Sequence, residues 1–147
     1  MTRVEFFIWP LCKKRYHDLA ICNLISSIYR SEGSLTVLIE DTKERERFDH
    51  LLWTFEQTSF IPHGVDNTYP VELTSDAFKA KKNILMNLGP SCPMEPEKFE
   101  IIVETAGHDE STRSEARLKF KKYKGHGIEI SSHKIEDITE TKNISLR

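Results

Sequence analysis

The 147-residue chain has only three cysteines, and no two of them lie close together in the sequence. Cys12, Cys22 and Cys92 are odd in number and widely separated, and no Cys-x-x-Cys occurs. This pattern indicates neither a zinc site nor a disulfide framework. We therefore expect three reduced cysteines, at least one of them buried, and we predict no metal and no cofactor.

Long apolar runs are also absent. No stretch approaches the roughly 20 residues that cross a bilayer, and the N-terminus lacks the apolar core of a signal peptide. We therefore predict a cytoplasmic protein with no membrane contact. A net charge of −2 with 30% charged residues excludes a strongly basic chain, so little direct binding to nucleic acid is expected.

Glycine is missing where nucleotide chemistry would need it. The loop at residues 9–14 has no glycine that would let the backbone approach a pyrophosphate, and no Gly-x-x-x-x-Gly-Lys occurs. Cys12 as a phosphatase-like nucleophile would want an arginine six positions on, and that position holds Asp18. The sequence gives no positive sign of an enzyme. The cations from Lys13 to Arg15 leave one alternative open, a small α/β nucleotide-binding protein or enzyme that uses this helix start.

Short apolar runs alternate with amphipathic segments along the chain. Residues 3–9 and 35–39 are typical of strands buried on both faces, and residues 13–30 carry a helical stripe between them. This order predicts a right-handed βαβ unit. Further strands are expected near 69–73, 84–88, 99–103 and 128–130, and helices from Asp41 to about Trp53 and from Asp109 or Ser111 to about Lys124. The pattern predicts a single three-layer α/β domain with a mainly parallel sheet over residues 1–132, and a loose polar tail over 133–147.

Residues 52–63 contain an aromatic side chain that does not fit its own helix. A core stripe is formed by Phe48, Leu51, Leu52 and Phe55, and Trp53 lies off this stripe at about 100° per residue. A Trp that points away from its core indicates a surface that a partner covers. The alternative is that Trp53 packs under the loop that follows.

The segment from Arg113 to Lys124 is strongly basic. It holds six positive charges against one negative charge in a chain that is slightly acidic. One side of the predicted helix carries Arg113, Arg117, Phe120, Lys121 and Lys124. A cationic side with one aromatic suits an acidic peptide with an apolar end. The alternatives are a solvated face with Phe120 packed inward, and direct contact with nucleic acid, for which the patch is small.

The segments Leu52 to His63 and Glu115 to Gly127 also carry a resemblance, supported by weaker segments at 20–24, 70–71 and 84–88. From about Val4 to Ile130 the chain resembles the chi subunit of bacterial DNA polymerase III, an accessory of the clamp loader. The resemblance implies a Rossmann-like fold without a nucleotide site. It also implies a non-enzymatic adaptor that works in DNA replication.

The resemblance implies two separate partner surfaces. It places the psi subunit of the clamp loader on Trp53, Phe60, Pro62 and His63, with a helicase as another candidate for that surface. It places the acidic C-terminal tail of single-stranded DNA-binding protein on Arg113, Arg117, Phe120, Lys121 and Lys124, with Ser132 nearby. An adaptor of this kind should show an exposed aromatic patch and a separate basic groove, with no deep polar pocket above the first strand.

Two positions depart from the family pattern. Phe120 stands where the family usually carries a tyrosine, so a hydroxyl hydrogen bond to the tail is missing at this position. Asn23 stands where a basic residue is common. The first departure affects the expected affinity for the tail but not the expected mode of binding.

Overall fold

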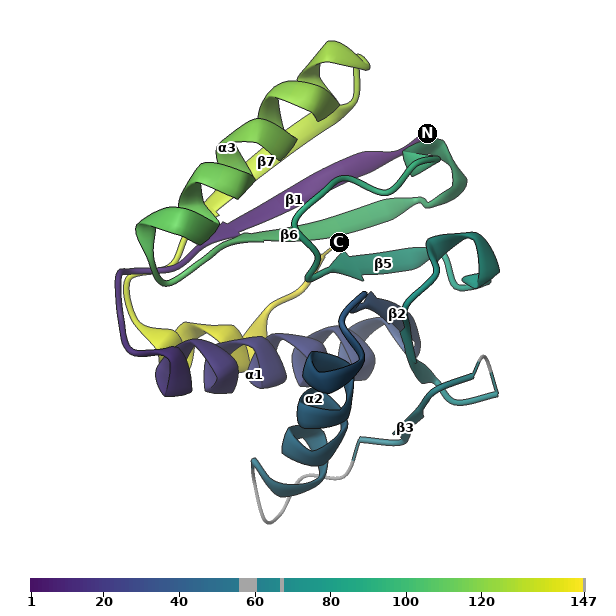
Figure 1. The fold of residues 1–147 in the computed structure, drawn as a ribbon, viewed down its shortest axis with the longest axis vertical. Coiled ribbons are helices and arrows are strands. Elements are labelled where there is room, and N and C mark those ends of the chain that lie inside the picture. The colour runs from purple at the N-terminus through teal and green to yellow at the C-terminus, as the bar shows by residue number, and fades with distance from the viewer. Residues whose placement is uncertain (56–60, 67, 147) are drawn as a thin grey trace.

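The structure is a computed structural model that describes residues 1–55, 61–66 and 68–146, apart from the side chains of residues 138 and 139. Its centre is a seven-stranded sheet in which every paired strand runs parallel to its neighbour (Figure 1). The order across the sheet is β3-β4-β2-β5-β6-β1-β7. The strands are β1 (Arg3–Ile8), β2 (Leu35–Leu38), β3 (His63–Gly64), β4 (Val71–Thr74), β5 (Ile84–Asn87), β6 (Ile101–Ala106) and β7 (Glu129–Lys134).

Helices cover both faces of this sheet. The helices are α1 (Lys14–Glu32), α2 (Thr42–Thr54) and α3 (Glu110–Gly125), with 3-10 turns η1 (Ala77–Lys79), η2 (Pro96–Lys98) and η3 (Ile138–Asn143). The crossover from β1 through α1 leads to β2 on one side of β1, whereas the crossover from β6 through α3 leads to β7 on its other side. Since both crossovers are right-handed by the general rule, α1 and α3 lie on opposite faces. The predicted three-layer α/β fold is confirmed.

The first strand shows why the sheet reads as a continuous apolar run in the sequence. Phe7 packs in the core beneath α1, while Val4 and Phe6 pack in the core beneath α3. Strands covered on both faces need apolar residues at successive positions rather than at alternate ones. The apolar run at residues 3–8 is therefore an interior strand of the sheet, between β6 and β7.

Local capping residues set the ends of the helices. Asp109 accepts a hydrogen bond from the Thr112 backbone and forms a capping box with it, as predicted for the start of α3. Asp41 caps α2 by accepting from the backbone of Lys43. Gly33 ends α1 with a positive φ of 87°, which glycine adopts without strain.

The C-terminal segment differs from the loose polar tail expected from its composition. β7 extends to Lys134, and the segment then crosses to lie along α1, where η3 packs (Figure 1). Ile135 and Leu146 are buried in the α1 core, and the Ser27 hydroxyl donates to the Thr141 carbonyl at 2.6 Å. A few isolated apolar residues are enough to anchor a polar segment when the surface that receives them is preformed. Within the described ranges, no helix has the length and apolar character needed to span a bilayer.

Candidate functional site

A groove lies between α3 and the β7 edge of the sheet, and we name it the α3 groove. Its volume is about 430 Å³. Its lining comes from β1, β6, α3 and β7, namely Phe6, Ile8, Ala106, Arg113, Ala116, Arg117, Phe120, Lys121 and Ser132. The structure thus brings together all but one of the residues predicted for the acidic tail. The exception is Lys124, which is exposed but does not line the groove.

The floor of the α3 groove is apolar and includes residues that sequence reasoning missed. Phe120 is half-buried, and its ring centroid lies 5.7 Å from that of Phe6. It therefore packs inward and faces the groove at the same time, which combines the two alternatives considered from its spacing. Phe6 and Ile8 alternate with Phe7 along β1, and this period of two was the signal that could have assigned them to the α3 face.

The rim of the α3 groove carries three cations, Arg113, Arg117 and Lys121, which differ in how far other groups of the protein already bind them. Arg113 is held in place, because its guanidinium donates to the carbonyls of Gly107 and Trp9. Arg117 makes a long, exposed ion pair of 3.7 Å with Glu110. Among the described residues, Lys121 has no ion pair and no hydrogen bond through its ammonium group. Arg117 and Lys121 are therefore available to an anionic ligand, and Arg113 fixes one end of the rim.

A buried ionic network lies under the same helix. The Lys119 ammonium donates to Glu104 at 2.9 Å, and the Tyr123 hydroxyl and the Asn87 amide donate to the other oxygen of that carboxylate. Burial raises the pKa of Glu104. The charge of Lys119 and the hydrogen bonds to the carboxylate act in the opposite direction, but the effect of burial is larger. Lys119 therefore does not belong to the cationic surface, although the sequence count included it. The network ties α3 to β6 and β5 and so fixes the geometry of the groove.

The predicted psi surface lies at the other edge of the sheet, beside β3. Trp53 is 51% exposed, in agreement with its position off the core stripe of α2. His63 is buried instead, and its ring lies 4.7 Å from the ring of Trp53. Its two nitrogens contact the Ile61 carbonyl at 2.7 Å and the Asp49 carbonyl at 2.9 Å. The imidazole thus lies beneath Trp53 as a support. Pro62 is half-buried, and the prediction for Phe60 falls outside the described residues.

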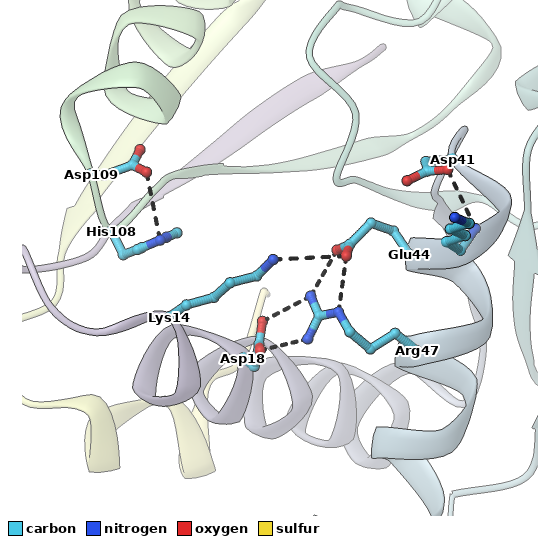
Figure 2. A network of polar contacts seen from close by, with 8 residues as sticks. Lys14, Asp18, Asp41, Glu44, Arg47, His108 and Asp109 are labelled. Atoms are coloured by element: carbon cyan, nitrogen blue, oxygen red, sulfur yellow. Dashed lines mark hydrogen bonds and ion pairs between the residues drawn. The ribbon is translucent and has the colours of Figure 1, made fainter.

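A third feature is a polar crevice of about 240 Å³ at the carboxyl ends of the strands. Figure 2 shows its ionic centre, where Arg47 contacts Asp18 at 2.6 Å and Glu44 at 2.7 Å, and Lys14 approaches Glu44 at 3.8 Å. The hydrogen bond from Arg47 is the main reason that the pKa of Glu44 is lowered. The expectation for an adaptor was that no deep polar pocket would lie above the first strand, and this crevice is the polar pocket of that region. Rossmann-like proteins bind ligands at this place.

The chemistry of the crevice does not suit a phosphate. Its cations are already paired with carboxylates, and Glu40, Asp41 and Glu115 add further negative charge to the lining. His17 carries little positive charge there, because burial first and the neighbouring His108 second lower its pKa to about 4. Within the described part of the chain, no group of three or more His, Cys, Asp or Glu residues could hold a metal ion.

The parallel sheet with helices on both faces defines a class, the Rossmann-like α/β proteins, and the chain lacks the glycines of their nucleotide-binding members. Residues 1–131 match the family model of the DNA polymerase III chi subunit, HolC. The chain therefore belongs to the chi subunit family of DNA polymerase III, whose members are accessory subunits in DNA replication.

Three curated relatives support this membership, each named DNA polymerase III subunit chi. The chain is 27% identical over 142 residues to the protein of Pseudomonas aeruginosa, covering 94% of this chain and 100% of that protein. It is 25% identical to the protein of Haemophilus influenzae, covering 91% and 97% of the two chains. It is also 25% identical to the protein of Escherichia coli, covering 76% and 81%.

Proposed function

We propose that the chain is a non-catalytic adaptor that connects the clamp loader of DNA polymerase III to the acidic C-terminal tail of single-stranded DNA-binding protein. The observation that carries the proposal is the α3 groove, with its apolar floor and its cationic rim. Family membership supports a role in the polymerase complex. Such an adaptor works where the replication machinery works, so we also propose a cytoplasmic location.

The α3 groove suits a peptide with carboxylates beside an apolar end. Arg117 and Lys121 are one helical turn apart, so their charged groups can share one carboxylate, and the terminal carboxylate is the best candidate. The apolar end of the peptide would pack on Phe120 and Phe6. Arg113 would bind a second carboxylate at a fixed position, because backbone carbonyls already orient its guanidinium. Ser132 lines the β7 side and could donate a hydrogen bond.

The second surface of the adaptor would receive the psi subunit on Trp53. Exposed tryptophans at the centre of an interface often contribute much of its binding free energy. The support for this assignment is the exposed indole, whose ring is held by the buried imidazole of His63. His63 would then act through Trp53 rather than by direct contact. Pro62 and Phe60 remain part of the proposed surface on the resemblance alone.

The α3 groove can be tested with two charge reversals on one helix. Fluorescence anisotropy of a labelled tail peptide should show that Lys121→Glu removes most of the binding, because repulsion replaces attraction at the rim. Lys122→Glu makes the same change at an exposed neighbour outside the groove, so it should bind nearly as the wild type does. Equal affinities for the wild type and Lys121→Glu would refute the proposal.

Lys124 provides a further discrimination within the proposed site. The resemblance assigned it to the tail, whereas it does not line the α3 groove. If only the groove binds, Lys124→Glu should follow Lys122→Glu in the anisotropy assay. If the tail continues along the helix, Lys124→Glu should lose affinity in part, and that result would extend the site toward the C-terminal end of α3.

A further inference from the structure

Two backbone loops meet beside the guanidinium of Arg113, at one end of the α3 groove. One loop joins β1 to α1, and the other joins β6 to α3. The loops are tied to each other, because the N–H of Cys12 donates to the carbonyl of His108 at 3.3 Å. The Arg113 guanidinium donates to the Trp9 carbonyl of the first loop and to the Gly107 carbonyl of the second. Arg113 is therefore oriented by backbone groups that neither loop supplies alone.

Gly107 lies very close to the first turn of α3. A Cβ at position 107 would lie 2.1 Å from the Oγ1 atom and 2.4 Å from the Cβ atom of Thr112, which is closer than atoms approach one another in a packed interior. The φ of Gly107 is not positive, so its backbone conformation does not itself require glycine. The lack of space beside Thr112 is therefore the reason for a glycine at this position.

Thr112 connects this close contact to the cationic rim. Its hydroxyl donates to the Asp109 carboxylate at 2.7 Å, and its backbone N–H donates to the same oxygen at 2.9 Å. These hydrogen bonds belong to the capping box that fixes the first turn of α3. Arg113 is the next residue of the helix, so a displacement of Thr112 moves the backbone that carries the guanidinium.

We propose that the contact between Gly107 and Thr112 positions Arg113 for a carboxylate of the acidic tail, so that Gly107 is a positioning residue of the α3 groove. This inference rests on the proposed function, since it concerns how the same groove recognises its peptide. A guanidinium that is already held in one orientation loses less conformational freedom on binding a carboxylate than a mobile one does. Gly107 thus contributes to binding through Arg113 rather than through contact with the peptide.

A double-mutant cycle tests whether Gly107 acts through Arg113. Fluorescence anisotropy with the labelled tail peptide should show that Gly107→Ala weakens binding by about fivefold, the upper range for one exposed charge pair. Arg113→Met should weaken binding to a similar extent, and Gly107→Ala should have no further effect in the Arg113→Met chain. A general loosening of the fold would instead add its own loss. Gly125→Ala is the matched control on the same helix, because a Cβ there would meet open space, and it should bind as the wild type does.

A second pair of variants keeps the test decisive if circular dichroism shows that Gly107→Ala does not fold. Thr112→Val keeps the volume beside Gly107 but removes the hydroxyl that bonds Asp109, so it should weaken tail binding by about threefold. Thr112→Ser keeps the hydroxyl and should bind nearly as the wild type does. The effect of Thr112→Val should also vanish in the Arg113→Met chain.

The outcomes separate this inference from the proposed function. If Lys121→Glu loses the tail while the folded variants at positions 107 and 112 bind as the wild type does, the positioning inference is wrong and the groove assignment stands. If the losses from Gly107→Ala and Arg113→Met simply add, Gly107 does not act through Arg113, which also overturns the inference. If Lys121→Glu binds at full strength, the tail does not use the α3 groove and both fail.

Discussion

The two edges of the sheet present opposite kinds of surface. The β7 edge offers a groove with an apolar floor and a cationic rim, whereas the β3 edge offers the exposed indole of Trp53 above the buried ring of His63. β7 has six residues and β3 has two, so a helix and a long strand enclose the first site while a turn supports the second. The comparison shows how one small domain can offer two well-separated surfaces of different shape.

The largest expected effect is on the β7 edge. Lys119→Met leaves Glu104 buried without its cation, which should lower the free energy of unfolding by about 3–5 kcal/mol. Urea denaturation followed by circular dichroism measures this loss. Tyr123→Phe is the milder control, because it removes one hydroxyl donor and should cost about 1–3 kcal/mol. A Lys119→Met protein as stable as the wild type would mean that the network does not hold α3.

The second-largest effect is a loss of binding that should be confined to the β3 edge. Trp53→Ala should weaken psi binding by about 2–4 kcal/mol, since it removes a central aromatic anchor. Calorimetry with psi measures the loss, and anisotropy with the tail peptide should remain unchanged because the α3 groove lies at the opposite edge. Phe60→Ala is expected to behave in the same way. Loss of tail binding in Trp53→Ala would show that the two edges are coupled.

A pH experiment tests the crevice between the two edges. His17 has a lowered pKa of about 4, so the unfolded chain binds a proton below about pH 6.5 that the folded chain excludes. Stability should therefore fall as the pH drops from about 6.5 to 4, and the share from His17 is at most about 3 kcal/mol. Urea denaturation at pH 7 and pH 4.5 should show a smaller fall for His17→Gln than for the wild type. His126→Gln, at an exposed position, should keep the wild-type slope.

A smaller change in peptide affinity tests the role of Phe120 in the α3 groove. Phe120→Tyr adds the hydroxyl that the resemblance implies at this position, and one added hydrogen bond should tighten tail binding by about 0.5–1.5 kcal/mol. Phe78→Tyr is a matched control, because Phe78 is exposed on the η1 turn away from the groove. Anisotropy with the labelled tail decides between them. Weaker binding by Phe120→Tyr would place the Phe120 ring too close to the peptide for an added oxygen.

No effect at all is expected from nucleotides. ATP, GTP and NAD should give no heat in calorimetry at millimolar ligand, because the crevice has paired cations and added carboxylates instead of a glycine cradle. Micromolar affinity for any of the three would favour the alternative function, a small α/β nucleotide-binding protein. In that case Lys14→Ala should weaken the interaction, since Lys14 is the cation of the helix start that lines the crevice.

The fold was largely predictable because most strands are covered on both faces, the exposed edge strand β7 being the exception among the described residues. Such strands need apolar residues in succession, and this leaves clear runs such as residues 3–8. The order of strands across the sheet was not predictable, since it depends on pairing between distant segments. The packed C-terminal segment was missed for a related reason, because Ile135 and Leu146 are too isolated in the sequence to form a stripe.

The sites were predictable only in part. Spacing grouped Arg113, Arg117 and Lys121 on one side of a helix, and the structure sets them around one groove. Spacing could not show that Lys119 turns inward, because its partner Glu104 lies on a different element. It also could not show that His63 lies beneath Trp53, since that depends on how β3 docks against α2.

The position of β1 between the two last strands has a consequence for the order of folding. Arg3 pairs with Ile101 on one side and with Glu129 on the other, so β1 is made long before either of its neighbours. Contacts this distant in sequence slow folding and leave a strand edge open during synthesis. Trp53 and the strands β2, β3 and β4 all lie before residue 75, whereas the α3 groove needs Phe6 and Ser132 together. The surface at the β3 edge can thus form early in synthesis, whereas the α3 groove forms only after β7 has been made.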